Sequence, residues 1–346
     1  MPARDHSIDI ARGIAIIAIV FGHVLRGVKN ASLVAADAPW YLVVDRATYM
    51  IHLAIFAMAA GLMVHSSVQR RGSGPYLRDR LADFAWVYVI WSVLQGSLQY
   101  VLADAVNNGR SLQSVLTLWV PTNQMWFLPW IAVMSVFAVV ARPWLSSTRT
   151  WVFLVVSAAI SIASWGVFGP FIFAQGLGLT FFYGIGVTVG LSGYAQIRER
   201  LTPVLTWLGA TACGLVYLTM AIFAQASAPT TTQFDRSPST VALGVVCATA
   251  GVVAVFLASI LVKPAGPVAR LLAYLGRQSM VIFLAHTMAL AAVRIVLMRL
   301  GFDSAALHLV LGTLGGVAGS LVAWWATRQR LPVLWSAPAR LRGRSV

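Results

Sequence analysis

Charge is scarce in this sequence of 346 residues. Charged residues make up 10% of it, and only ten are carboxylates, whereas a water-soluble protein carries roughly 25% charged residues. Hydrophobic residues reach 59%, and the mean hydropathy is +0.80. This composition excludes a soluble globular enzyme and indicates an integral membrane protein.

Cysteine is almost absent as well. The only two cysteines, Cys213 and Cys247, both fall inside long apolar runs. That placement excludes a disulfide framework and a cysteine-based metal site. We expect both to be small buried packing residues, and we expect no metal cofactor.

Long apolar runs are abundant. A helix needs about 20 apolar residues to cross the hydrocarbon core of a membrane. Candidate runs cover residues 8–28, 42–66, 84–105, 126–141, 151–168, 171–192, 204–224, 241–262, 279–299 and 305–327. We therefore predict an all-α, polytopic bundle of about ten transmembrane helices in a single domain, residues 1–330, followed by a basic cytoplasmic tail, residues 331–346. No small-residue cleavage site follows Val28, so we expect the first span to remain as an anchor.

The basic residues predict the orientation. They outnumber the acidic ones by 25 to 10, and Lys and Arg are enriched in cytoplasmic loops. With both termini in the cytoplasm, the inner segments hold Arg4, Arg70, Arg71, Arg78, Arg80, Arg142, Arg149, Arg198, Arg200, Lys263, Arg270, Arg277, Arg328, Arg330, Arg340, Arg342 and Arg344. We expect the plasma membrane as the location. The excess of positive charge then reflects the cytoplasmic position of these loops and their attraction to anionic headgroups. We therefore expect no nucleic-acid partner.

The first span carries Arg12 near its cytoplasmic end and His23 towards its outer end. Eleven residues separate them, which is three helical turns plus about 20°, so they share one face about 16 Å apart. An ionisable group inside a membrane is costly unless it faces a protein interior or a watery cavity. The alternative is that Arg12 extends to the headgroups and that His23 is a structural histidine.

Three further ionisable residues lie at overlapping depths in other spans. Asp45 begins the second span at about the depth of His23, where its carboxylate could orient the imidazole, or could pair with the adjacent Arg46. His52 lies deeper in that span, and His286 lies at a similar depth in the ninth. Three histidines that converge from three helices favour a functional site over three separate structural hydrogen bonds.

Two polar segments outside the spans are weaker candidates. Arg78 and Arg80 precede the third span on the cytoplasmic side, where they could hold phosphates or act as positive-inside anchors. Asn123 and Trp126 open the fourth span on the outer side. Trp126 fits either a sugar-stacking platform or an interfacial aromatic belt.

Several short motifs together resemble the membrane-bound acyltransferase 3 family, whose members O-acylate sugars and other hydroxyl-bearing acceptors. The motifs run in order along residues 8–290. They are Asp9-Ile-Ala-Arg12-Gly13 through Gly22-His23, Ile51-His52 to Phe56 and Gly61, Trp126-Phe127-Leu128, Phe181-Phe182 with Gly186, and Leu275-Gly-Arg-Gln-Ser279 to Leu284-Ala-His286. The chain departs from the family where Ala54 and Ala60 replace the usual proline and serine, where Val87 replaces a proline, and where Asp83 stands in place of a second arginine three residues after Arg80.

The resemblance implies a membrane O-acyltransferase. It implies that Arg12 and Arg80, with Arg78 in a supporting role, bind the phosphates of cytoplasmic acyl-CoA, most simply acetyl-CoA. His23 would act as general base or as transient acyl acceptor, with Asp45 as the orienting carboxylate. The acceptor would be a hydroxyl of a sugar, glycan or glycolipid near His52, Asn123, Trp126 and His286. Two alternatives stay open: a secondary transporter or lipid flippase with an Arg/Asp/His pathway, and a non-catalytic scaffold.

Overall fold

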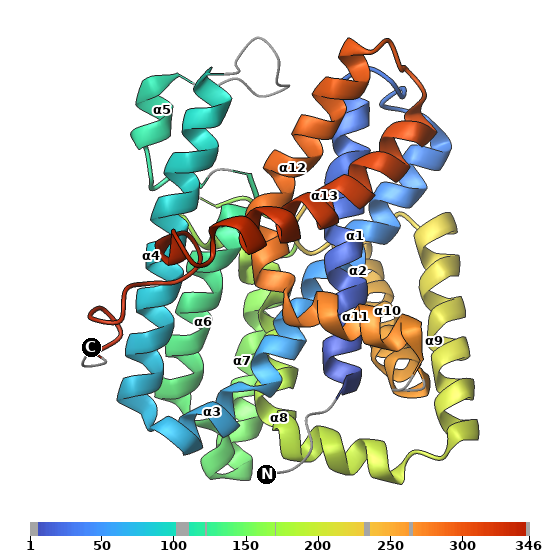
Figure 1. Ribbon diagram of the computed structural model, residues 1–346. Coiled ribbons are helices and arrows are strands. Elements are labelled where there is room, and N and C mark those ends of the chain that lie inside the picture. Colours follow the sequence, from blue (N-terminus) through green and yellow to red (C-terminus); the bar gives the residue numbers. More distant parts are fainter. Residues whose placement is uncertain are drawn as a thin grey trace.

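The described part of the chain is helical almost throughout. The computed structural model describes residues 6–101, 111–121, 123–169, 171–231, 236–262 and 266–343. Its major helices are α1 (His6–Asn30), α2 (Pro39–Leu62), α3 (Val64–Arg71), α4 (Ser73–Val101), α6 (Phe127–Ala141), α7 (Ser147–Ala163), α8 (Thr180–Arg200), α9 (Pro203–Phe223), α10 (Pro238–Leu261), α11 (Pro267–Arg277), α12 (Ser279–Arg299) and α13 (Ala305–Thr327) (Figure 1).

Nine segments of the described chain are long and apolar enough to cross a membrane, and α7 is a shorter apolar helix of 17 residues. The predicted all-α polytopic bundle is therefore confirmed. The cytoplasmic placement of both termini stays a prediction. Of the basic residues that support it, Arg4, Lys263 and Arg344 lie outside the described residues.

The start of the third span differs from the prediction. We expected it at residue 84, because residues 78–83 are mostly charged, but α4 begins at Ser73. Charged residues are tolerated in a helix that extends beyond the apolar core, so composition marks the edge of the apolar run and not the end of the helix. Arg78 and Arg80 consequently lie inside α4, and its helical period determines the direction in which each side chain points.

The helix α1 lies in the middle of the bundle. It packs against α2, α10, α11, α12 and α13, while α4 and α9 lie toward opposite edges (Figure 1). Many large apolar side chains of α9 are exposed, including Trp207 and Phe223. Such a surface suits contact with lipid, and the central position of α1 suits the helix that carries Arg12 and His23.

Two glycines bring α1 and α11 into backbone contact. An added Cβ on Gly13 would lie 2.1 Å from the carbonyl oxygen of Leu272, and one on Gly276 would lie 1.8 Å from that of Asp9. Neither position has room for a side chain. Small residues allow such close approach between membrane helices.

A second glycine pair joins α2 to α8. An added Cβ on Gly61 would lie 2.3 Å from the carbonyl oxygen of Tyr183, and one on Gly186 would lie 2.2 Å from that of Met58. All four glycines lie in the motifs that carry the family resemblance. Their common task is therefore to set the distances between helices.

The first prediction concerns the contact between α1 and α11. Gly276→Ala should destabilise the protein by at least about 1–3 kcal/mol, because the added methyl overlaps a backbone oxygen and the helices must separate. Gly214→Ala in α9 is the matched control, since an added Cβ there meets nothing within 4 Å. Thermal unfolding in detergent measures both. An unchanged Tm for Gly276→Ala would contradict the packing described above.

Candidate functional site

The larger of two cavities along α1 is lined by His23 and His52, whereas the third predicted histidine, His286, is buried and is not part of the lining. Its volume is about 550 Å³, and we call it the histidine cavity. Its polar lining comes from α1, α2, α4, α12 and the segments before α6, α8 and α10. The lining includes His23, Arg26, Tyr49, His52, Gln95, Asn123, Gln124, Gln175, Thr231, Thr287 and Arg294.

The three predicted histidines do gather. The ring centroids of His23 and His286 are 5.0 Å apart. Tyr49 joins the third, since its ring centroid is 6.3 Å from that of His23 and 4.8 Å from that of His52. Helices α1, α2 and α12 thus bring residues from positions 23 to 286 into one cluster. Among the described residues, no three His, Cys, Asp or Glu side chains are grouped as metal ligands.

Backbone contacts define which ring nitrogens of two histidines hold a proton. Nδ1 of His286 lies 3.0 Å from the carbonyl oxygen of Ile282 and 2.9 Å from that of Phe283. Nδ1 of His52 likewise faces the carbonyl oxygen of Thr48. A carbonyl only accepts, so each Nδ1 is the donor and each neutral ring keeps Nε2 as an acceptor. Nε2 of His286 is buried without a hydrogen-bond partner.

Asp45 is held by an arginine that the sequence analysis did not consider. Its two carboxylate oxygens accept hydrogen bonds from Nε and Nη2 of Arg26, at 2.6 and 2.8 Å. The guanidinium of Arg26 also lies over the ring of Tyr49, 3.3 Å from its centroid. The neighbouring Arg46 donates to carbonyl oxygens of Ala221 and Ala224 instead. Asp45 therefore neutralises the guanidinium nearest to the histidine cluster.

Neutral amides form another part of the cavity wall. Nε2 of Gln95 donates to the carbonyl oxygen of Leu284 at 2.9 Å, and Nε2 of Gln124 donates to that of Phe283 at 3.3 Å. Asn123 lines the same cavity with a left-handed backbone, φ 46°, which Asn tolerates better than most residues. Trp126 lines it as well and is buried. Amides beside an indole are suited to a hydroxyl-rich ligand.

The smaller cavity contains Arg12 and Arg80. Its volume is about 90 Å³, and we call it the arginine cavity. Nη2 of Arg12 donates to Oγ of Ser279 at 2.8 Å. The guanidinium of Arg80 lies 4.9 Å from the ring centroid of Phe84, and its Nε is buried without a hydrogen-bond partner. The cavity thus offers two guanidinium groups in an otherwise mostly apolar lining.

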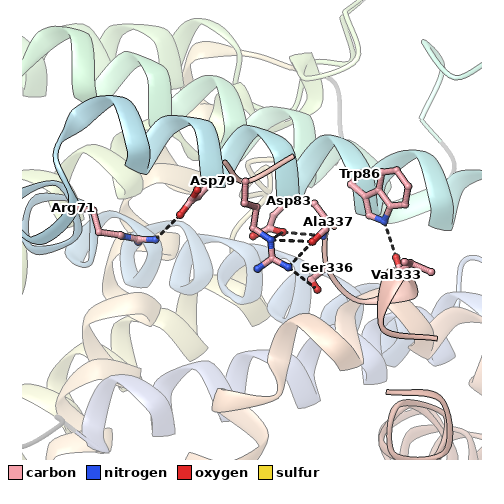
Figure 2. Close-up of polar contacts among 8 residues, drawn as sticks. Arg71, Asp79, Asp83, Trp86, Val333, Ser336 and Ala337 are labelled. Atoms are coloured by element: carbon pink, nitrogen blue, oxygen red, sulfur yellow. Dashed lines mark hydrogen bonds and ion pairs between the residues drawn. The ribbon is translucent and has the colours of Figure 1, made fainter. Parts of the chain in front are cut away.

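Arg78 does not reach this cavity. It is exposed and lies against Gly343 in the C-terminal strap, by which we mean residues 332–343. Figure 2 shows the strap along α4, with Trp86 donating to the carbonyl oxygen of Val333 at 2.7 Å and Asp83 accepting from the backbone of Ala337 at 3.0 Å. Arg342 lies 3.5 Å from Asp83. The predicted basic tail is therefore packed against α4.

Three apolar side chains separate the two cavities. Ile19, Leu53 and Phe283 line both of them, and we call these residues the apolar neck. They belong to α1, α2 and α12, the helices that carry the three histidines. The two cavities are consequently stacked along α1, with Arg12 on one side of the neck and His23 on the other.

Several site residues were not anticipated, chief among them Arg26, Tyr49 and Gln95. Arg26 follows His23 by three residues, so helical spacing alone places it near the same face. The glutamines carried no comparable signal, because a neutral amide in a span is common in structural roles.

Comparison with known proteins agrees with the motifs. A family model described as an acyltransferase domain, that of acyltransferase family 3, matches residues 5–325. A search of the curated proteins and a search of the solved structures found no match. The match spans nearly the whole chain, including both cavities and the neck. The chain therefore belongs to the acyltransferase 3 family.

Proposed function

We propose that this membrane acyltransferase moves an acyl group, most simply acetyl, from cytoplasmic acyl-CoA to a hydroxyl of a sugar, glycan or glycolipid. The observation that carries the proposal is the stacking of the arginine cavity and the histidine cavity along α1. One cavity suits a polyanionic donor, and the other suits a neutral, hydroxyl-rich group. The reaction would take place where they meet.

Arg12 and Arg80 would hold the donor. A guanidinium binds phosphate through paired hydrogen bonds, and the unpartnered Nε of Arg80 supports such a role. A volume of about 90 Å³ is too small for a whole nucleotide, so only part of the donor would enter. The slender thioester arm would pass the neck towards His23, about 16 Å from Arg12 along α1.

His23 would handle the proton. In direct transfer, the acceptor oxygen attacks the thioester carbonyl carbon while His23 takes the hydroxyl proton. The carbon–sulfur bond then breaks, and the CoA thiolate leaves and receives a proton. In the second route, a ring nitrogen of His23 attacks the thioester carbon, the carbon–sulfur bond breaks, and the CoA thiolate leaves and is protonated. The acceptor hydroxyl then attacks the acyl carbon, and its proton goes to the imidazole as the acyl–nitrogen bond breaks. Both routes stay open.

A neighbouring hydrogen-bond acceptor would orient the imidazole of His23. Nε2 of His286 has no partner, and its ring lies 5.0 Å from that of His23. This makes His286 a better candidate than our first one, Asp45, whose two oxygens already accept from Arg26. Asp45 would act indirectly, by keeping Arg26 over Tyr49.

The second prediction tests the role of His23. His23→Gln should lower acyl transfer by at least about 10²-fold, the lower end of the contribution of general base catalysis. His65→Gln is the matched control, because His65 stacks on Trp144 and lines neither cavity. Mass spectrometry of envelope glycans and secreted metabolites, from cells with each variant, would follow the acyl mass increment. Full acylation with His23→Gln at normal expression would exclude the proposed role.

The third prediction tests the donor site. Arg80→Gln should weaken acetyl-CoA binding by about tenfold, since one charge-assisted contact to phosphate is lost. Arg78→Gln should leave the Kd within about twofold, because Arg78 lies outside the arginine cavity. Equilibrium binding to purified protein measures both. Equal effects of the two variants would mean that the arginines only raise the local charge.

The fourth prediction tests the neck. Leu53→Trp should lower transfer at least tenfold and affect acetyl-CoA binding much less, because the indole fills the passage between the cavities but leaves Arg12 and Arg80 in place. Leu53→Ala widens the neck and should retain transfer, which controls for loss of the leucine. Because overpacking costs about 1–3 kcal/mol, the Tm of Leu53→Trp is measured alongside. Transfer at the normal rate by folded Leu53→Trp would place the donor route elsewhere.

The same preparations distinguish acyl transfer from transport. Acyltransferase activity in liposomes requires that acyl-CoA is consumed as the acylated product forms. Movement of a glycolipid across the bilayer without acyl-CoA consumption would favour the transporter alternative.

A further inference from the structure

The charges around the histidine cavity do not balance. Among the described residues, its charged lining consists of two arginines, Arg26 and Arg294, with no lysine or carboxylate. Arg26 is neutralised by Asp45 through two hydrogen bonds. Arg294 has no carboxylate within ion-pair distance in the described part of the chain. Within the described ranges, the cavity thus has one positive charge without a carboxylate partner.

The guanidinium of Arg294 is directed at α1. Nη1 lies 3.4 Å from the carbonyl oxygen of Gly27, a long contact that leaves most of its five N–H donors unused. An added Cβ on Gly27 would lie 3.3 Å from the same nitrogen. The missing side chain therefore makes room for the guanidinium beside the cavity.

Another reason for an arginine at a helix end is contact with lipid headgroups. Arg299, in the last turn of the same helix α12, fits that description, because it is exposed and lines neither cavity. Arg294 is half-buried and lines the histidine cavity. Seven residues, almost two full turns, place it on the same face of α12 as Thr287, which also lines the cavity. Arg294 therefore adjoins the histidine cavity, whereas Arg299 lies on the outer surface of the protein.

The contact between Arg294 and Gly27 sets how far the guanidinium lies from His23 along α1. Gly27 follows His23 by four residues, which is about 6 Å along α1. That distance is about the width of one sugar ring. A ligand with its reacting hydroxyl at His23 would place a substituent on the far side of the same ring near Arg294.

We infer that the acceptor is an acidic sugar, with a carboxylate or phosphate on the ring whose hydroxyl is acylated, and that Arg294 binds this anionic group. The inference rests on the proposed function, and it adds the charge of the acceptor. A guanidinium pairs with either group through two parallel hydrogen bonds. The attraction is strong here because the site is only partly solvated. A neutral sugar would leave the charge of Arg294 uncompensated.

The fifth prediction is a binding experiment that needs no acyl-CoA. Purified protein in nanodiscs of neutral lipid is titrated with methyl glucuronide, glucose 1-phosphate and neutral methyl glucoside. At least one anionic probe should bind about tenfold more tightly than the neutral one, and the preferred probe distinguishes carboxylate from phosphate. Arg294→Gln should reduce the preference to about onefold, and Arg294→Lys should keep part of it. Arg299→Gln, the matched control, should keep all of it.

Three results would overturn the inference. They are equal binding of neutral and anionic sugars by the unchanged protein, no binding of either anionic probe, and an undiminished preference in folded Arg294→Gln. A lower Tm of Arg294→Gln in anionic but not in neutral nanodiscs, with sugar binding unchanged, would show a headgroup anchor instead. If the preference exists but His23→Gln still acylates, the proposed function fails and this inference stands. If acylation depends on His23 but the preference is absent, only this inference fails.

Discussion

The backbone contact between α1 and α11 controls the geometry of both cavities. Gly13 and Gly276 allow the two helices to approach so closely that neither position has room for a Cβ. The chain turns at Gln278 immediately after this contact, and α12 begins at Ser279, 2.8 Å from Arg12. From there α12 runs beside α1 and brings His286 to His23. A larger separation of the helices at Gly13 and Gly276 would therefore disturb both the contact of Arg12 with α12 and the contact of His23 with His286.

The second constraint is the cost of charge in a membrane. A buried guanidinium is tolerated only with a partner or a watery cavity. The described residues satisfy this rule in three ways: Asp45 pairs with Arg26, backbone oxygens accept from Arg46, and a cavity adjoins Arg12, Arg80 and Arg294. Arg26 lines a cavity although it is paired, and Arg12 lies 3.8 Å from Asp9 as well as beside a cavity. Under the proposed function, Arg12 and Arg80 would bind the donor, and Arg294 would bind the acceptor.

Under the proposed function, the apolar neck would protect the acyl group. A thioester exposed to water beside an activating imidazole would be open to hydrolysis, so excluding water from the route would preserve it. Ile19, Leu53 and Phe283 are apolar and lie between the cavities. Under the proposed function, the donor arm would displace no ordered polar contact when it passes, and its acyl end would meet the acceptor only beyond the neck.

Composition and helical periodicity alone determined the class of the protein, the number of apolar spans and the shared face of Arg12 and His23. These are local properties, since 3.6 residues per turn apply within any helix. Periodicity also explains why Arg78 and Arg80, two residues apart in α4, face opposite ways. We did not predict this, because we expected that span to begin only at residue 84.

Only the tertiary structure decided which side chain meets which. Asp45 had two plausible partners in the sequence, yet its carboxylate accepts hydrogen bonds from Arg26, because the crossing of α1 and α2 places that guanidinium over Tyr49. The tail looked like a free basic segment, but Asp83 and Trp86 hold it on α4. Spacing along one helix cannot supply such pairings, because they depend on how far apart and at what angle two helices pack. The sequence alone therefore identified the candidate site residues, and the packing of the helices selected their partners.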